Sequence, residues 1–262
     1  MIPLVLFIVC ILASSVGAVV GAGGGVIIKP VLDMIGILPV STVSFCSGCT
    51  VLGMSVCSLI RGRKDGVRLQ VRISTALAVG AVLGGLLGKW LFELVRNSFP
   101  NERALGAIQA VFLTIITFLV LLYVCNKDRL PSKRIQNLGV SVIIGVVLGV
   151  ISSFLGIGGG TSNVAVLFFF FSMEAKEAAK NSIYIIIFSQ ISSIASALVT
   201  SSVPDFEWMN LICMVAGGIS GALVGAAISR RIDNAGVEKI LKILLLLIVA
   251  MDFYNVLQYT IL

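Results

Sequence analysis

Three consecutive glycines interrupt apolar sequence at two places in this chain. Residues 21–25 read Gly-Ala-Gly-Gly-Gly, and residues 156–160 read Gly-Ile-Gly-Gly-Gly. Each glycine costs a helix roughly 1 kcal/mol relative to alanine, so both sites predict a break inside an apolar helical segment. Irregular backbone at membrane depth survives only where protein shelters it or where it lines a cavity. Matched breaks in two halves of a chain are typical of a transporter's binding site.

The composition places these breaks in a membrane protein. Of the 262 residues, 58% are hydrophobic and only 12% are charged, and the mean hydropathy is +1.10, which is too apolar for a soluble domain of this length. At about 20 residues per span, the chain has room for about eight crossing segments. The net charge of +7 comes from basic residues in short loops, which favours positive-inside topology over nucleic acid binding. We therefore expect a multi-pass cell-membrane protein with the lipid bilayer as a partner and no nucleic acid partner. A homo-oligomer stays open.

Apolar segments follow the same order in both halves. Before and after the first break they cover residues 2–20, 26–37, 42–60, 73–95 and 104–124. Around the second they cover 138–155, 161–171, 182–200, 209–229 and a last span that ends near residue 259. Glycines at four-residue spacing line one face of the corresponding spans, at Gly80, Gly84 and Gly88 and again at Gly217, Gly221 and Gly225, which lets another helix approach closely. We predict an all-α polytopic membrane protein with two repeats, residues 1–130 and 131–262, in one integral unit.

Loop charges predict how the two repeats are related. Loops 61–72 and 125–137 carry an excess of Lys and Arg, and loop 230–239 opens with two arginines, whereas loop 201–208 has two acidic residues and no base. All three basic loops fall on the cytoplasmic side only if each broken segment dips into the membrane and returns. Each half then crosses three times and the second half is inverted. We predict two inverted repeats, each a broken or re-entrant hairpin plus three transmembrane helices, with 96–103 and 201–208 outside and the hairpin tips meeting.

These motifs resemble a known family. The duplicated glycine break, the Lys29-Pro30-x-Leu32 sequence after its first copy and the glycine-faced third span look like the sulfite exporter TauE/SafE family of membrane permeases. The resemblance covers nearly the whole chain and implies transport of small, often sulfur-containing anions such as sulfite or organosulfonates. The family tends to have proline after both breaks, whereas the second copy here continues Thr-Ser-Asn-Val-Ala.

The breaks also suit an anion on physical grounds. The first N–H groups of a half-helix lack intrahelical partners and carry the positive end of the macrodipole. Two such N-termini would cradle an anion, with neutral donors nearby. The predicted substrate-binding residues are Gly21, Gly23, Gly24, Gly25, Lys29, Gly156, Gly158, Gly159, Gly160, Thr161, Ser162, Asn163, Asn181 and Ser182. The competing interpretation is that the glycines only let helices pack and the hydroxyls only cap.

Ionisable residues inside apolar segments have more than one interpretation. A lysine at mid-bilayer costs about 2.5–3.5 kcal/mol, so Lys29 is expected to be paired, snorkelling or functional. Asp33 lies one helical turn later, and a structural Lys29–Asp33 pair is at least as well supported as an anion ligand. Asp252 stands alone in the last span, where it is either a proton site or an interfacial carboxylate.

The chain lacks the residues of other functional classes. Without histidine it has no catalytic triad and no histidine metal site, and its glycine runs lack the Gly-Lys-Ser/Thr of a nucleotide-binding loop. We expect no catalytic residues, no metal site and no cofactor. A secondary carrier for a small anionic substrate is the first hypothesis. The alternatives are an anion channel, and a membrane subunit or enzyme that hands substrate to a partner.

Overall fold

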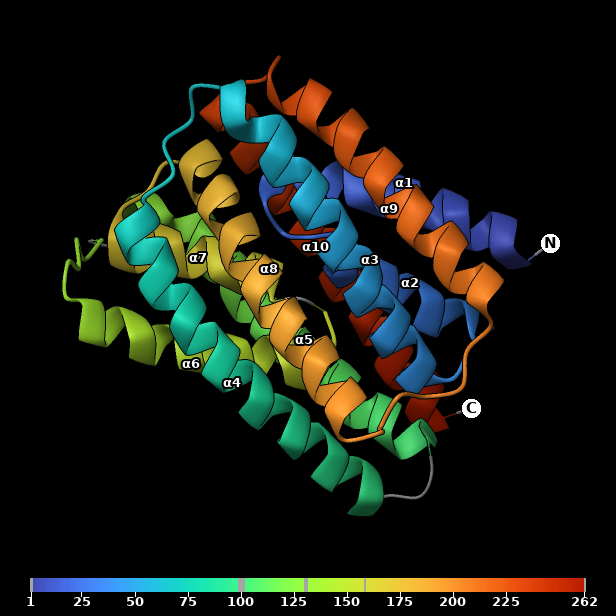
Figure 1. The fold of residues 1–262 in the computed structure, drawn as a ribbon. Coiled ribbons are helices and arrows are strands. Elements are labelled where there is room, and N and C mark those ends of the chain that lie inside the picture. Colours follow the sequence, from blue (N-terminus) through green and yellow to red (C-terminus); the bar gives the residue numbers. More distant parts are fainter. Residues whose placement is uncertain (1, 99–101, 130–131, 158, 262) are drawn as a thin grey trace.

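The protein is helical throughout the part that this computed structural model describes, residues 2–98, 102–129, 132–157 and 159–261 (Figure 1). The helices are α1 (Ile2–Val20), α2 (Gly25–Ile35), α3 (Val40–Arg61), α4 (Val71–Ser98), α5 (Glu102–Asn126), α6 (Leu138–Leu155), α7 (Gly160–Phe171), α8 (Ala175–Val199), α9 (Trp208–Ser229) and α10 (Asn234–Ile261). Eight of these, all except the short α2 and α7, are long and apolar enough to cross a membrane. The prediction of an all-α, multi-pass membrane protein is confirmed.

The helix boundaries follow the apolar segments with one clear exception. The structure gives α1 and α6 the predicted bounds, and both end directly before a glycine break. Helix α8 instead begins at Ala175, seven residues before the predicted start at Ser182. Its first six residues, Ala-Lys-Glu-Ala-Ala-Lys, are strong helix formers. Half of them are charged, so the apolar pattern alone places the start of the helix too late. Asn181 therefore lies in the second turn of α8 and does not open the helix.

The glycine-faced helices make the most extensive helix–helix contacts among the described residues. Helix α4 packs on α6, and α9 packs on α1, so each half's first helix pairs with the other half's fourth. A methyl group added to Gly80, Gly84 or Gly88 would strike the carbonyl oxygens of Val142, Val146 or Val150, respectively. Added to Gly217, Gly221 or Gly225, it would strike those of Phe7, Ile11 or Ser15. Residue numbers rise together within both pairs, so α4 is parallel to α6 and α9 is parallel to α1.

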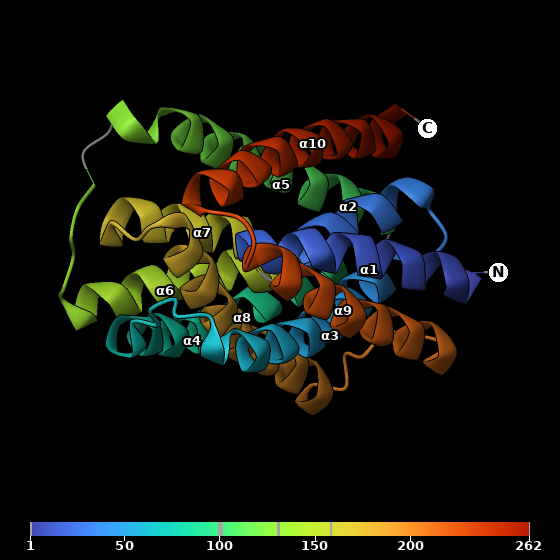
Figure 2. The ribbon, with the colours of Figure 1, turned by 90° about the horizontal axis from the view of Figure 1, so that it is seen from above.

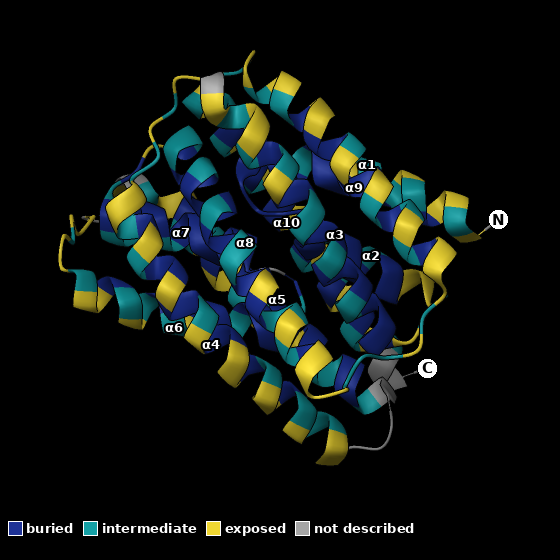
Figure 3. Cartoon of the chain, viewed as in Figure 1, coloured by how far each residue is buried: buried dark blue, intermediate teal, exposed yellow. Residues whose placement is uncertain are grey.

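The two central helices of the bundle are α3 and α8. They pack against each other, and each also packs on the glycine-faced helix of the other half, α3 on α9 and α8 on α4. Figure 3 shows that their inward surfaces are buried. Helices α5 and α10 form a separate pair that lies over the short helices, α10 on α2 and α5 on α7 (Figure 2).

The basic loops gather at one end of the bundle. The loop after α3 is bound to α8 through Lys180 and Asp65, and Arg230 Nη2 donates to the Arg61 carbonyl at 2.9 Å. Lys127, after α5, forms an ion pair with Glu238 of α10. At the opposite end, Thr42 near the start of α3 donates to the Asp205 carbonyl of the acidic loop at 3.0 Å.

Candidate functional site

Each glycine break reverses the chain between a long and a short helix. Helix α1 ends at Val20, Gly21 adopts a left-handed φ of +74°, and α2 begins four residues later. Helix α6 ends at Leu155, Gly156 has a φ of +67°, and α7 begins at Gly160. Left-handed backbone is costly for any side chain with a Cβ, so the two reversals depend on glycine.

The tips of the two hairpins touch each other. A methyl group on Gly160 would overlap the carbonyl oxygen of Ala22, and one on Gly25 would lie 2.5 Å from the carbonyl oxygen of Ile157. The carbonyl of each break thus lies against the first turn of the other half's short helix. Figure 2 shows α1 and α2 on the side of the chain termini and α6 and α7 on the opposite side. The expected meeting of the tips is confirmed, as a direct contact.

Ser182 of α8 joins the two breaks. Its hydroxyl donates to the Gly21 carbonyl at 2.7 Å and lies 3.4 Å from the Gly160 carbonyl. The residue is fully buried. On the other side of the first break, the Gly24 N–H donates to Met54 Sδ at 3.2 Å, a weak acceptor that leaves this N–H poorly satisfied. Both sequence-predicted residues, Gly24 and Ser182, therefore lie where the breaks meet.

The polar residues that follow the second break are buried. Thr161, Ser162 and Asn163 occupy the first turn of α7, and each is less than 6% exposed. Asn163 Oδ1 would lie 3.4 Å from a methyl group on Gly159, so this side chain folds back toward the break. Ser162 instead lines an apolar groove between α5, α6 and α7. Gly158, also predicted for the site, lies outside the described residues.

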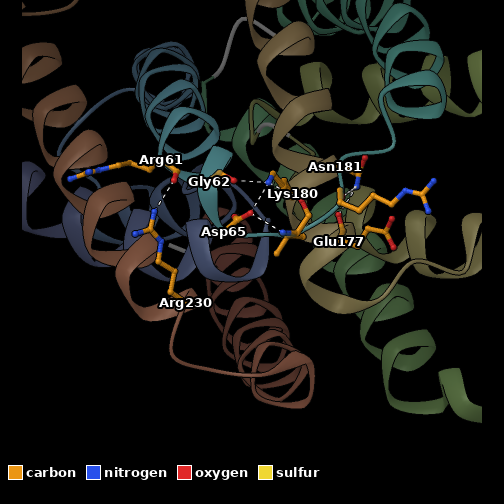
Figure 4. A network of polar contacts seen from close by, with 9 residues as sticks. Arg61, Gly62, Asp65, Glu177, Lys180, Asn181 and Arg230 are labelled. Atoms are coloured by element: carbon orange, nitrogen blue, oxygen red, sulfur yellow. Dashed lines mark hydrogen bonds and ion pairs between the residues drawn. The ribbon is translucent and has the colours of Figure 1, made fainter.

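Asn181 and Lys29 are held by other contacts. The Asn181 side chain binds the loop after α3: its oxygen accepts from Gln70 N at 2.9 Å and from the Ser74 hydroxyl, and its nitrogen donates to two carbonyls, those of Arg68 and Glu177 (Figure 4). Lys29 Nζ lies 3.0 Å from Asp33 Oδ2, where α2 packs on α10. The structure thus has the Lys29–Asp33 ion pair that the sequence offers as one of two alternatives.

A small polar cavity reaches the second break from the end that carries the acidic loop. It measures about 40 Å³ and lies between α3, α4, α6 and α8 beside Gly156. Its walls carry six serines (Ser41, Ser44, Ser152, Ser153, Ser193 and Ser202), together with Gln190 and the cations Lys89 and Arg96. Both cations contact Glu93, at 2.8 and 3.6 Å.

A larger cavity approaches the first break from the basic end. It measures about 300 Å³ and lies between α1, α3, α8 and α9, with Val19 and Ala179 at its inner wall. A methyl group on Gly21 would collide with Ala179, so this wall directly backs the first break. Lys180 and Arg230 line the cavity, and Lys180 Nζ is tied to Asp65 Oδ1 at 2.7 Å and to the Gly62 carbonyl at 2.6 Å (Figure 4).

Three serines whose hydroxyl oxygens are buried around the breaks are not among the residues predicted from the sequence. Ser14 lies against Gly24, Ser44 against Gly156 and Ser152 against Gly159. Their hydroxyls have no hydrogen-bond partner within the described ranges. The sequence does contain a pattern that points to them. Serines recur three residues apart at the start of α3, which places them on one helix face, and two more serines lie one turn before the second break.

Comparison with known proteins supports a transport role. A protein-family model described as "Sulfite exporter TauE/SafE" matches residues 6–251. The "Probable membrane transporter protein YunE" of Bacillus subtilis is 23% identical, with 93% of this chain and 94% of that protein covered. YjnA of the same organism, also described as a probable membrane transporter protein, is 22% identical, covering 91% and 96%. The "Sulfate permease CysP" of that organism is 28% identical over 60% of this chain and 41% of its own length. No solved structure matches the chain. Match and fold together establish that this multi-pass membrane protein belongs to the sulfite exporter TauE/SafE family of membrane transporters.

Proposed function

We propose that this protein is a secondary transporter for a small anion, of the sulfur-containing kind represented by sulfite or an organosulfonate. The observation that carries the proposal is the contact of the two hairpin tips, with one polar cavity on either side of it. A site reached from two ends through separate cavities is what alternating access requires. The similarity to a protein described as a sulfate permease supports a sulfur oxyanion as cargo.

The charges and donors along this path fit an anion. Lys89 and Arg96 line one cavity, Lys180 and Arg230 line the other, and the walls between them offer serine hydroxyls. Each cation is offset by a nearby carboxylate or carbonyl, so an anion is attracted without being trapped. At the contact itself, each half-helix N-terminus now faces a carbonyl oxygen of the opposite break. In the proposed cycle the tips part, and the anion replaces these carbonyls at the two N-termini.

We infer further that the halves are inverted repeats. Helix α4 runs parallel to α6 and α9 runs parallel to α1, and the same pairing recurs with the roles of the halves exchanged. The two cavities are likewise lined by corresponding helices of the two halves. One lies between α3, α4, α6 and α8, and the other between their counterparts α8, α9, α1 and α3. The larger cavity at the basic end supports a conformation that is more open on the proposed cytoplasmic side.

Cysteine labelling tests this topology. Single cysteines are introduced at Arg68 and at Ser202 in a variant without the six native cysteines, and a membrane-impermeant maleimide is applied to intact cells. We expect Ser202→Cys to react from outside and Arg68→Cys only after permeabilisation. Labelling of both from the same side would contradict the inverted arrangement.

Flux through the purified protein tests the function. Proteoliposomes are loaded with unlabelled sulfite, sulfate, methanesulfonate or chloride, and uptake of the corresponding labelled anion is followed. A carrier gives saturable counterflow, because a loaded site returns faster than an empty one. An anion channel, the alternative, gives uptake that does not depend on internal anion. Absence of flux for the whole panel would favour a subunit that delivers substrate to a partner.

A further inference from the structure

A charged cluster is buried between α2 and α10, on a different contact from that of the breaks. Lys29 Nζ lies 3.0 Å from Asp33 Oδ2, and Asp252 of α10 lies within electrostatic range of both. One turn after Asp252, Asn255 Nδ2 donates to the Pro30 carbonyl at 3.0 Å, which fixes how the two helices face each other. Lys29, Asp33 and Asp252 are 2%, 8% and 1% exposed, so all three are shielded from water.

The charges in this cluster do not balance. It holds one ammonium group and two carboxyl groups, and an unpaired carboxylate shielded from water is costly in a membrane-spanning helix. Asp33 Oδ1 and Asp252 Oδ2 are both buried without a hydrogen-bond partner in the described part of the chain. With Lys29 bound to Asp33, the second carboxyl group is left without a counter-ion. A proton on Asp252 removes that excess charge.

Among the described residues, the other bases and cations of the helices packed around Asp252 lie toward the basic end of the bundle. Helix α1 contributes Cys10 as its one ionisable residue, and α5 has none from Ala104 to Leu122. The side chains of Glu102 and Arg103, at the start of α5, lie outside the described set. Ionisable residues of α8 lie in its first half, from Lys176 to Tyr184, toward the basic end. On α10 itself, Glu238, Lys239 and Lys242 lie near that same end, and Tyr254 is half exposed.

The position of the cluster links it to the breaks. Lys29 lies one turn into α2, the short helix whose first residue, Gly25, contacts Ile157 of the second break. A shift of α2 against α10 would therefore move Gly25 relative to the second break. Toward the end of α10, Asn255 Oδ1 and Gln258 Oε1 are also buried and unpartnered. These oxygens extend the set of buried polar groups from Asp252 toward the end of the helix.

We propose that Asp252 is a proton-carrying site and that Lys29 exchanges between Asp33 and Asp252 as the proton binds and leaves, which couples anion movement to proton movement. The inference rests on the proposed transport function. When the proton binds, an O–H bond forms on Asp252 and Lys29 stays with Asp33. When the proton leaves to water, the Asp252 carboxylate attracts the Lys29 ammonium and α2 shifts against α10. A sodium ion fits less well, because the ammonium group already fills the place beside the carboxylates.

The test compares proton-driven and exchange transport in the same proteoliposomes. Labelled anion uptake is measured with an imposed pH gradient and, separately, as counterflow at equal pH, while pyranine inside the vesicles reports proton movement. We expect Asp252→Asn to lose proton-driven uptake and the pyranine signal at least tenfold while counterflow stays within twofold of wild type. Asp205→Asn, in the exposed acidic loop, is the matched control and should leave both unchanged.

The outcomes separate this proposal from the transport function. If wild-type protein shows no counterflow of any anion, the transport proposal fails. If counterflow is present but a sodium gradient drives uptake and a proton gradient does not, the assignment of a proton site is wrong. The assignment is also wrong if Asp252→Asn keeps proton-driven uptake. Infrared spectroscopy gives a readout that needs no transport: wild type should show the carbonyl band of a buried carboxylic acid that Asp252→Glu shifts and Asp205→Asn does not. An unshifted band in folded Asp252→Glu protein would also overturn the assignment.

Discussion

The two glycine breaks share a backbone but differ in the side chains that follow. Both reverse the chain through left-handed glycines, and each places a carbonyl against the first turn of the other. After the first break the short helix is apolar apart from the Lys29–Asp33 pair, whereas the second continues with Thr161, Ser162 and Asn163. The two breaks therefore have the same backbone shape but different polar side chains. Neutral donors follow the second break, and the charged Lys29–Asp33 pair follows the first. In the proposed cycle the N-termini at both breaks hold the anion, the second break adds neutral side-chain donors, and the first break also responds to the proton.

The largest expected effect separates Gly160 of the second break from Gly23 of the first, because a methyl group has room at only one of them. A methyl group on Gly160 would overlap the Ala22 carbonyl, which is backbone and cannot move aside without parting the tips. On Gly23 it would meet only the ends of Ile186 and Val51 at 3.3 and 3.4 Å, so its cost is the left-handed φ of +65°, about 1–2 kcal/mol. We expect Gly160→Ala to lower the melting temperature in detergent and abolish flux, and Gly23→Ala to fold with a smaller loss. Similar melting temperatures for the two would mean that the tip contact is not tight.

A second pair tests the anion cradle at both breaks. A methyl group on Gly24 would lie 2.6 Å from the Ser14 hydroxyl, 3.2 Å from Ile28 Cδ1 and 3.3 Å from Ser14 Cα, at a right-handed φ. Gly159→Ala adds a strained φ of +69° and crowds Ser152. If the N–H groups of both breaks hold the anion, each change should reduce flux and anion binding at least tenfold with folded protein retained, and Gly159→Ala should be the less stable. Binding is measured by calorimetry and folding by size-exclusion chromatography.

The control for this pair is Gly53→Ala. Gly84, which from the sequence alone looks suitable, is not, because its methyl group would strike the Val146 carbonyl and disturb the α4–α6 contact. Gly53 faces only the side chains of Val215 and Ile219, the nearest at 3.2 Å, and should leave flux unchanged. If folded Gly24→Ala and Gly159→Ala protein binds the anion with wild-type affinity, the N–H groups of the breaks do not hold the anion. The glycines would then serve only to let the chain pack closely.

A smaller effect is expected at two serines in equivalent places. Ser47 follows Gly25 by the same number of residues as Ser182 follows Gly160. The Ser47 hydroxyl has no hydrogen-bond partner among the described residues, whereas that of Ser182 donates to the Gly21 carbonyl at 2.7 Å. Removing a made hydrogen bond costs about 1 kcal/mol, and removing an unmade one costs nothing. Ser182→Ala should therefore lower thermal stability by a few degrees and Ser47→Ala should not. Equal shifts would show that the bridge between the breaks contributes nothing.

Most of the fold could be predicted from the sequence because lipid imposes simple rules. Apolar length located eight spans, and triple glycines located both reversals. Contacts between distant segments could not be predicted in this way. Gly84 was recognised as a packing glycine, but its partner Val146 belongs to the other half. The sequence predicts Asn181 as a ligand, and the structure shows that its side chain binds the loop after α3. The sequence does not distinguish a polar side chain that binds substrate from one that holds a loop.

The smallest effect concerns Asn163, where the two breaks differ most in chemistry. The corresponding residue after the first break is Ile28, which is fully buried, and Asn163 is 2% exposed with an unpartnered Oδ1. If Asn163 serves the anion, through its amide N–H group, Asn163→Ala should weaken anion affinity by roughly fivefold, which corresponds to about 1 kcal/mol. Thermal stability should be unchanged or slightly higher, because an unsatisfied buried oxygen is removed. Ile28→Ala is the mirror control: it leaves a cavity, so stability falls while the affinity of the folded fraction is kept. Calorimetric titration with sulfite and a thermal melt on both variants measure the two quantities. A loss of stability without loss of affinity in Asn163→Ala would give this residue a structural role, and the difference between the breaks would then lie in packing alone.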